Sequence, residues 1–344
     1  MGKATKMRSL LKNNGMCSDG LDRSLCVAPM MDWTDRHCRY FHRLLAPQAL
    51  LFTEMVTAEA ILHAGADKFC QHDAHEHPLA LQLGGSDPDR LAAAVRAVEP
   101  FGFDEINLNV GCPSPRVQSG RFGAYLMTEP ELVADIIIAM RAWTDRPVTV
   151  KCRIGVDDMD PETGLDRFVD AVADAGVQVI YLHARKAWLN GLSPKENREI
   201  PPLDYGRAER LARRRPELDI ILNGGLKTLD QCTQQLSIFD GVMVGRAAYQ
   251  TPQLLLGVDH HIFKSDPPHK TAFEALMAYQ PYVESVLAQG FPLKHLTRHL
   301  VGLYHDVPGA RRYRRILSER SHLPGATWKV VEEALAAIPN VEMI

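Results

Sequence analysis

The chain has 344 residues, enough for one large domain and a smaller one. Hydrophobic residues make up 46% and charged residues 24%, which is ordinary for a soluble globular protein, and a net charge of −3 means that any basic face must be local. No apolar run is long enough for a membrane helix, and seven scattered cysteines without a C-x-x-C pair argue against a disulfide framework or a zinc ribbon.

Residues 1–23 lack the apolar centre of a signal peptide. Their composition predicts a disordered N-terminal tail. Without a signal peptide or a membrane span, we expect the protein to be cytoplasmic.

From residue 24 to residue 257, short apolar runs alternate with amphipathic helical patterns such as Asp89–Val98 and Glu131–Trp143. The second of these follows Thr128, which we interpret as the start of a capping box with Pro130 at the second helical position. The apolar runs are Cys26–Met31, Leu50–Val56, Leu79–Leu83, Ile106–Val110, Val148–Ile154, Val179–His183, Ile220–Asn223 and Gly241–Gly245. Eight strand–helix units predict an α/β fold, a (β/α)8 TIM barrel. A doubly wound open sheet is the alternative, but the G-x-G-x-x-G motif that would favour it is absent after the first run.

Most of these runs carry one polar side chain near the carboxyl end, among apolar neighbours. These residues are Glu54, Gln82, Asn109, Lys151, His183 and Asn223. A barrel places all of these ends at one rim, where the active sites of this fold are found. One such residue alone is more often a satisfied core residue. Six of them on six runs predict a polar site at the mouth of the barrel.

The run Ile106–Val110 leads into a loop that carries a lone cysteine, Cys112, between a glycine and a proline. Asn107 and Asn109 lie on one face of the run, and inward amides need polar partners. The glycine and proline predict a turn, so that Cys112 lies just beyond the end of the strand. A free cysteine is most often a small buried hydrophobe. Next to the polar rim, however, Cys112 indicates the edge of an active site.

The seventh and eighth runs are followed by Asn223-Gly224-Gly225 and Gly245-Arg246. The loops after these two strands usually bind phosphate in this fold, because glycines expose backbone N–H groups and an arginine adds charge. A bound flavin mononucleotide (FMN) would place its phosphate there. Its ring would then contact Pro29, Met30, Met31, Gln82, Lys151 and His183.

Two connections, residues 112–127 and 184–203, are unusually long for a compact domain. The second contains Arg185, Lys186 and Trp188. Basic residues beside an aromatic suit an unstacked RNA base and its phosphates, although a solvated loop is the default interpretation.

We expect no metal site. Cys70, His72, His75 and His77 are crowded together, but their spacing matches no zinc finger and acidic residues lie between them. The acidic stretch 157–162 lacks the spacing and the central glycine of a calcium loop.

Beyond residue 257 the strand–helix alternation stops. Residues 258–270 are interpreted as a linker, and residues 271–344 as a small all-α domain with helices at Ala272–Ala288, Leu293–Leu303, Arg311–Arg320 and Trp328–Ala337. Basic residues gather here at Lys294, Arg298, Arg311, Arg312, Arg314, Arg315 and Arg320. A charge run is most often a solvated helix face. Five of these residues fall within ten positions, however, which favours a polyanionic partner.

Several motifs resemble those of tRNA-dihydrouridine synthases. They are Ala28–Asp35, Gln82–Gly85, the stretch from Glu105 to Ser114, His183–Leu189 and Gly309–Arg311. The run from His183 through Arg198 is most similar to the A-type bacterial branch. The resemblance extends from about Leu25 to the last helix.

This resemblance implies an enzyme with non-covalent FMN that uses NADPH to reduce the C5=C6 bond of uridines in the tRNA D-loop. The A branch is similar to enzymes that act on uridines 20 and 20a. By the same resemblance Cys112 is the general acid, which protonates C5 from the face opposite the hydride. Candidate tRNA contacts are Asn109, Arg185, Lys186, Arg311 and Arg314. We expect a monomer.

The chemistry of the residues agrees with this implication. No side chain supplies a hydride, so a redox cofactor must, and a thiol with the ordinary pKa of about 8.5 is protonated at neutral pH. Two alternatives stay open. A flavin-dependent reductase of a small pyrimidine or enone would not need the basic helices, and a non-catalytic RNA-binding protein would need neither the polar rim nor Cys112.

Overall fold

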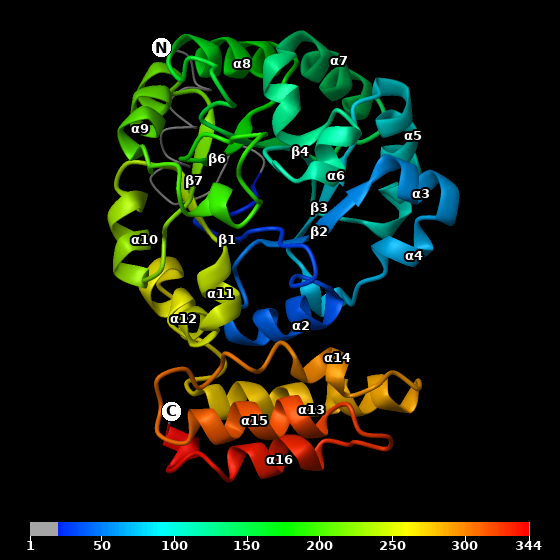
Figure 1. Ribbon diagram of the computed structural model, residues 1–344, viewed down its shortest axis with the longest axis vertical. Coiled ribbons are helices and arrows are strands. Elements are labelled where there is room, and N and C mark those ends of the chain that lie inside the picture. Colours follow the sequence, from blue (N-terminus) through cyan, green and yellow to red (C-terminus); the bar gives the residue numbers. More distant parts are fainter. Residues whose placement is uncertain (1–19, 344) are drawn as a thin grey trace.

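The computed structural model describes residues 20–343 and consists of a parallel eight-stranded barrel surrounded by helices, with further helices below it (Figure 1). The strands are β1 (Leu25–Val27), β2 (Leu51–Thr57), β3 (Leu79–Gly84), β4 (Glu105–Val110), β5 (Val148–Arg153), β6 (Val179–His183), β7 (Asp219–Asn223) and β8 (Gly241–Val244). Their order is β1-β8-β7-β6-β5-β4-β3-β2, and a parallel bridge between Cys26 and Leu50 joins the two ends of the sheet. The predicted barrel is confirmed.

Strand side chains alternate between two apolar layers, because successive residues of a strand point to opposite faces. The outward layer packs under the surrounding helices. The inward layer fills the barrel with Cys26, Ala28, Leu50, Phe52, Ala80, Val179, Tyr181, Ile221 and Met243. Inward positions on β4 and β5 are polar instead, and they are described with the site below.

The barrel helices follow the strands in the expected order. They are α2 (Arg36–Leu45), α3 (Ala58–Ala64), α4 (Asp67–Cys70), α5 (Pro88–Val98), α6 (Pro115–Ser119), α7 (Pro130–Arg141), α8 (Thr163–Asp174), α9 (Tyr205–Arg214), α10 (Leu229–Leu236), α11 (Arg246–Gln250) and α12 (Gln253–Leu256). The predicted capping box at Thr128 is wrong. Glu129 is the N-cap of α7, and the Thr128 hydroxyl donates to the Tyr125 carbonyl (2.8 Å), because residues 123–128 already form a 3-10 turn.

The barrel begins earlier than the predicted boundary at residue 24. Residues 1–19 of the predicted tail lie outside the described residues, but Leu21 packs against the inward layer and Arg23 is fully buried. Arg23 forms an ion pair with Glu105 on β4 (2.7 Å), a pairing across the barrel that local composition does not reveal.

Four helices follow the barrel and lie beneath it in Figure 1: α13 (Ala272–Ala288), α14 (Lys294–Thr297), α15 (Ala310–Arg320) and α16 (Lys329–Leu335). The predicted helix Leu293–Leu303 is too long, because the chain continues from Thr297 in irregular turns. Gly302 lies so close to α11 that a Cβ atom there would be 2.4 Å from the Gln250 carbonyl oxygen. None of the described helices is long and apolar enough to cross a membrane.

The barrel meets these helices through α2. The rings of Tyr40 and Tyr282 stack with centroids 3.8 Å apart. Asp35 caps α2 by accepting two backbone N–H bonds, and it also accepts hydrogen bonds from Arg298 (2.6 Å) and pairs with His299 (3.0 Å). One carboxylate therefore starts a barrel helix and holds the segment after α14 against it.

Replacing Asp35 with Ala should lower the free energy of unfolding by about 2–3 kcal/mol at neutral pH, because it removes a helix cap and a charged hydrogen bond. Asp35→Asn keeps an acceptor for the cap and should cost less. Burial raises the pKa of Asp35, but the hydrogen bond and charge of His299 and the charge of Arg298 outweigh burial and hold the pKa below its usual range. The stabilisation is therefore complete above the ordinary carboxyl pKa of about 3.9 and is lost as the pH falls below it.

Urea unfolding of the three proteins at pH 7 and pH 3 measures both effects. Equal stabilities at pH 7 would show that Asp35 does not hold the two parts together.

Candidate active site

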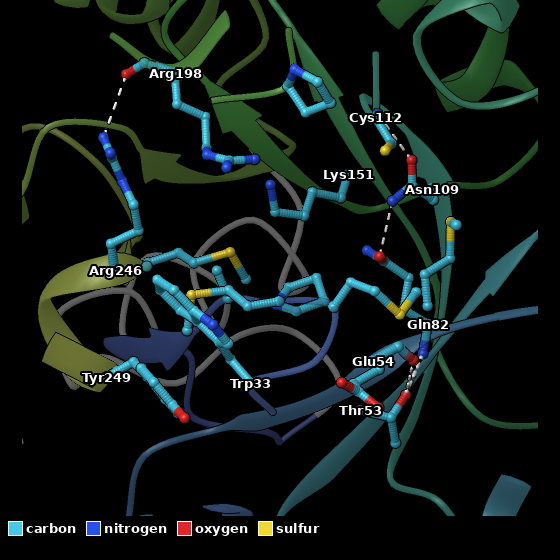
Figure 2. A pocket seen from close by; sticks show the side chains of 18 of the residues that line it. Trp33, Thr53, Glu54, Gln82, Asn109, Cys112, Lys151, Arg198, Arg246 and Tyr249 are labelled. Atoms are coloured by element: carbon cyan, nitrogen blue, oxygen red, sulfur yellow. Dashed lines mark hydrogen bonds between the residues drawn. The ribbon is translucent and has the colours of Figure 1, made fainter. Parts of the chain in front are cut away.

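A cavity of about 2000 Å³ opens at the carboxyl ends of the strands (Figure 2). All six polar residues predicted at the rim line it: Glu54, Gln82, Asn109, Lys151, His183 and Asn223. Arg298, His305 and Arg314 also line it, so the cavity extends from the barrel to the C-terminal helices. Pockets for one small ligand usually measure about 300–1,000 Å³. This cavity has room for a cofactor and part of a larger substrate.

Cys112 lies at this cavity on the loop between β4 and α6, where it is half-buried. Its thiol donates to the Ser114 hydroxyl (3.6 Å). Its backbone N–H donates to the Asn109 side-chain oxygen (3.0 Å), and the Asn109 amide donates to Gln82 (2.8 Å), as Figure 2 shows. The cysteine loop is therefore held by side chains of two neighbouring strands.

The floor of the site carries positive charge that no carboxylate of the rim neutralises by a hydrogen bond in the described chain. Lys151 donates to Asn223 (3.2 Å), a neutral partner. Burial, followed by the charge of Arg153, lowers the pKa of Lys151 to about 8. Burial and the same cations lower the pKa of His183 well below its usual value, so its imidazole is neutral at pH 7. A ligand that brings acceptor atoms or negative charge would stabilise these buried basic groups.

Two consecutive glycines after β7 form a cradle that a side chain would fill. Gly224 has a φ of +114° and Gly225 a φ of +74°, values that side chains rarely adopt. A Cβ atom would lie 2.7 Å from the His183 ring at Gly224 and 2.4 Å from Leu203 at Gly225. The backbone can therefore approach a ligand closely here.

The matching segment after β8 is open as well. Gly245 lines the cavity, and a Cβ atom there would meet Ala28 alone among the described residues, at 3.9 Å. Arg246 starts α11, forms an ion pair with Glu199 and donates to the Arg198 carbonyl (3.5 Å). A phosphate bound between these two glycine segments would therefore lie on the same side of the cavity as Arg246.

The segment after β1 continues this wall, because β1 pairs with β8. Pro29, Met30 and Met31 all line the cavity. The next aromatic residue, Trp33, stacks on Tyr249 of α11 with centroids 4.4 Å apart. Pro29, Met30 and Met31 therefore offer apolar contacts to a planar ligand.

The structure brings together all but two of the sequence-predicted site residues. Arg185 and Arg314 line the cavity, whereas Lys186 and Arg311 do not. The Lys186 ammonium donates to the Met159 carbonyl (2.9 Å), and Arg311 is exposed on α15. Among the described residues, no three or more His, Cys, Asp or Glu side chains are grouped to hold a metal ion.

Sequence reasoning missed Arg153, which lines the cavity two residues after Lys151 on β5. Its guanidinium donates to the backbone carbonyls of Gly111 (2.9 Å), Lys186 (3.1 Å) and Asn197 (3.0 Å), so it ties the cysteine loop to the loop after β6. Successive residues of a strand point to opposite faces, so Arg153 lies on the same inward face as Lys151. This alternation would have predicted that Arg153 belongs to the site.

The buried Asn197 was also missed. Its amide bonds to the backbone of Trp188 at both ends, 2.7 Å and 2.8 Å, and closes the long loop on itself. Backbone partners leave no pattern in a sequence, so no signal pointed to this residue.

Comparison with known proteins adds the family. Residues 26–339 match the family described as dihydrouridine synthase (Dus). The chain is 56% identical over 320 residues to a tRNA-dihydrouridine(20/20a) synthase of Vibrio cholerae serotype O1, which covers 93% of this chain and 98% of the relative. Proteins of the same name from Xanthomonas axonopodis pv. citri (57% over 311 residues; 90% and 92%) and Shewanella oneidensis (52% over 329 residues; 96% and 98%) are similarly close. As its motifs predicted, the chain belongs to the dihydrouridine synthase family.

Proposed function

We propose that this chain is a flavin-dependent tRNA-dihydrouridine synthase that reduces the C5=C6 bond of D-loop uridines, at positions 20 and 20a by analogy with its relatives. NADPH is the proposed electron donor. The observation that carries the proposal is the Cys112 thiol, held at the edge of a large cationic cavity in a chain of this family. A thiol at that place supplies the proton that a reduced double bond requires.

The residues of the cavity fit FMN. Gly224, Gly225 and Gly245 leave room for a phosphate beside Arg246, while Lys151 and Gln82 offer donors to the polar edge of the ring. The Pro29–Met31 wall provides apolar support for the ring. When bound, reduced flavin supplies the hydride for C6, and NADPH restores it.

The Cys112 thiol then donates its proton to C5. Lys151, Arg153 and Arg198 line the same cavity as Cys112, and the sulfur regains a proton from solvent after the transfer. Hydride at C6 and proton at C5 complete the saturation of the bond. Asn109 fixes the loop backbone, which keeps the thiol at the edge of the cavity.

The substrate base has to leave its stack to reach this thiol. The cavity accommodates an extruded nucleotide and continues to Arg298 and Arg314 of the C-terminal segment. We therefore propose residues 24–257, together with Leu21 and Arg23 just before that boundary, as the catalytic domain, 258–270 as the linker and 271–344 as the helical domain that binds tRNA. A reductase of a small pyrimidine or enone would not need cations from those helices.

Cys112→Ala tests the function directly. NADPH should still reduce the bound flavin at a near-normal rate, whereas dihydrouridine formation should fall by about 10²- to 10⁴-fold, the usual contribution of a general acid. The measurement is mass-spectrometric mapping of dihydrouridine in tRNA from a deletion strain that carries either protein. Unchanged dihydrouridine at every position after deletion would remove the proposed function. Loss of flavin reduction together with tRNA reduction would mean that Cys112 is structural.

A pH dependence follows from Lys151. Its pKa of about 8 applies without ligand, and an acceptor on the flavin favours the charged ammonium and raises that pKa. Binding therefore takes up a proton, and FMN affinity should fall as the pH rises from 8 to 9.5, by up to about tenfold per pH unit.

Lys151→Met should bind FMN more weakly and lose this pH slope. Arg246→Ala is the matched control, since it should weaken binding about tenfold or more while keeping the slope. The measurement is fluorescence titration of the cofactor-free protein with FMN. A slope that persists in Lys151→Met would assign the proton to another group.

A third expectation concerns the tRNA. Each phosphate neutralised by an arginine releases counterions, so binding should weaken steeply with salt, and reversing Arg311 and Arg314 to Glu should weaken it further and flatten the slope. Of the single reversals, Arg314→Glu should have the larger effect, because Arg314 lines the cavity and Arg311 is exposed outside it. Filter binding at several salt concentrations measures this, with quinone-dependent NADPH oxidation as the control for an intact barrel. A wild-type protein without a salt slope would contradict tRNA binding by these helices.

A further inference from the structure

A continuous chain of hydrogen bonds runs through the interior of the barrel to the cysteine loop. It begins at Glu105, the first residue of β4, and passes through Thr149, Asn107, Gln82 and Asn109 to the backbone N–H of Cys112. The successive distances are 2.6, 2.8, 2.8, 2.8 and 3.0 Å. All five side chains are buried, the most exposed being Asn109 at 8%.

The direction of every bond in this chain follows from its first member. An ionised carboxylate only accepts, so the Thr149 hydroxyl donates to Glu105 and must accept from the Asn107 amide. The Asn107 oxygen then accepts from the Gln82 amide, and the Gln82 oxygen from the Asn109 amide. The Asn109 oxygen is thereby left to accept the N–H of Cys112.

The surroundings of Glu105 keep it ionised. Arg23 donates to it at 2.8 Å and Tyr181 at 3.0 Å, in addition to Thr149. The guanidinium can only donate, and the Thr149 and Tyr181 hydroxyls already accept from Asn107 and Arg23. Burial raises the pKa of Glu105 above its usual value, and the charge of Arg23 and the hydrogen bonds from these three partners offset only part of the rise. An arginine at 2.7 Å cannot give up its own proton, so the carboxylate is the form that satisfies all of the donors.

We propose that Glu105 is a positioning residue for the site: through this chain it fixes which atoms Gln82 and Asn109 present to the cavity. Gln82 then has one amide hydrogen on Asn107 and its oxygen on Asn109, so that its second amide hydrogen is the donor it presents to the cavity. Asn109 turns its oxygen toward the cysteine loop. With the opposite direction, Asn109 would present N–H₂ to the N–H groups of Gly111 and Cys112, and the loop would lose its anchor. The consequences for FMN rest on the proposed function, whereas those for the cysteine loop do not.

Thr149→Val tests the proposal, because it removes the hydroxyl that links Glu105 to Asn107 at almost unchanged volume. Tyr181→Phe is the matched control, since it also removes one hydroxyl bond to Glu105 but lies outside the chain. Thr149→Ser should restore the link. The first readout is the rate at which iodoacetamide alkylates Cys112 in cofactor-free protein, followed by mass spectrometry of its peptide. The second is FMN affinity.

In Thr149→Val, alkylation of Cys112 should be faster and FMN affinity lower, each by about fivefold, the change that one ordinary hydrogen bond is worth. Tyr181→Phe and Thr149→Ser should resemble the wild type in both. Equal values for Thr149→Val and Tyr181→Phe would overturn the proposal. Should Thr149→Val not fold, Glu105→Gln replaces it. Its amide can donate to Thr149, so that the hydrogen bonds from Thr149 to Asn109 are no longer forced into one direction. An unchanged alkylation rate in a folded Glu105→Gln would overturn the proposal equally. A wild-type protein that binds no FMN would contradict the proposed function, while the alkylation test still decides on the chain.

Discussion

The buried ion pair between Arg23 and Glu105 is the interaction on which the interior of the barrel depends. Both side chains are fully buried, and their charged atoms lie 2.7 Å apart. Removing ions from water costs several kcal/mol each, and breaking such a pair leaves an uncompensated charge at a cost of about 3–5 kcal/mol. An apolar pair would fill the same space with comparable stability. An apolar pair, however, would not fix the direction of the hydrogen bonds through Asn107, Gln82 and Asn109, as the carboxylate does. This supports a positioning role for the pair rather than a purely stabilising one.

The charged groups at the two ends of the barrel differ in whether they have oppositely charged partners. At Glu105 every donor has an acceptor, whereas at the rim Lys151 and Arg153 lie beside neutral groups, and burial lowers the pKa of both, to about 8 and about 10. Such an arrangement is unfavourable for the chain by itself. It is the arrangement expected of a site that binds an electron-rich ligand, because a bound acceptor recovers part of the cost of desolvation.

Sequence reasoning found the barrel and its rim because both follow from periodicity: alternation fixes the faces of a strand, and the fold brings the carboxyl ends of all strands to one mouth. It failed where the cause is a contact between distant segments. Arg23 was assigned to a tail because its partner lies on β4, and the helix at Leu293 was made too long because Gly302 packs against Gln250. Arg153 obeys the alternation too, but it is the second polar residue near the end of its strand, and the rim was predicted from one polar residue per strand. The buried Asn197 bonds to backbone atoms and leaves no pattern to find.

The contact between the barrel and the C-terminal helices bears on the kind of substrate the cavity accepts. Trp33, which stacks on Tyr249, and Asp35, which binds Arg298 and His299, are separated by one residue, so a single short turn shapes the cavity wall and anchors the helices. The Asp35 carboxylate forms an ion pair with Arg298. Arg314 on α15 also lines the cavity, and it has no such partner among the ion pairs of the described residues. A small uncharged substrate would gain nothing from a cation on this part of the cavity wall. A polyanion that places one base at Cys112 and its flanking phosphates along the wall would use both parts of the chain at once.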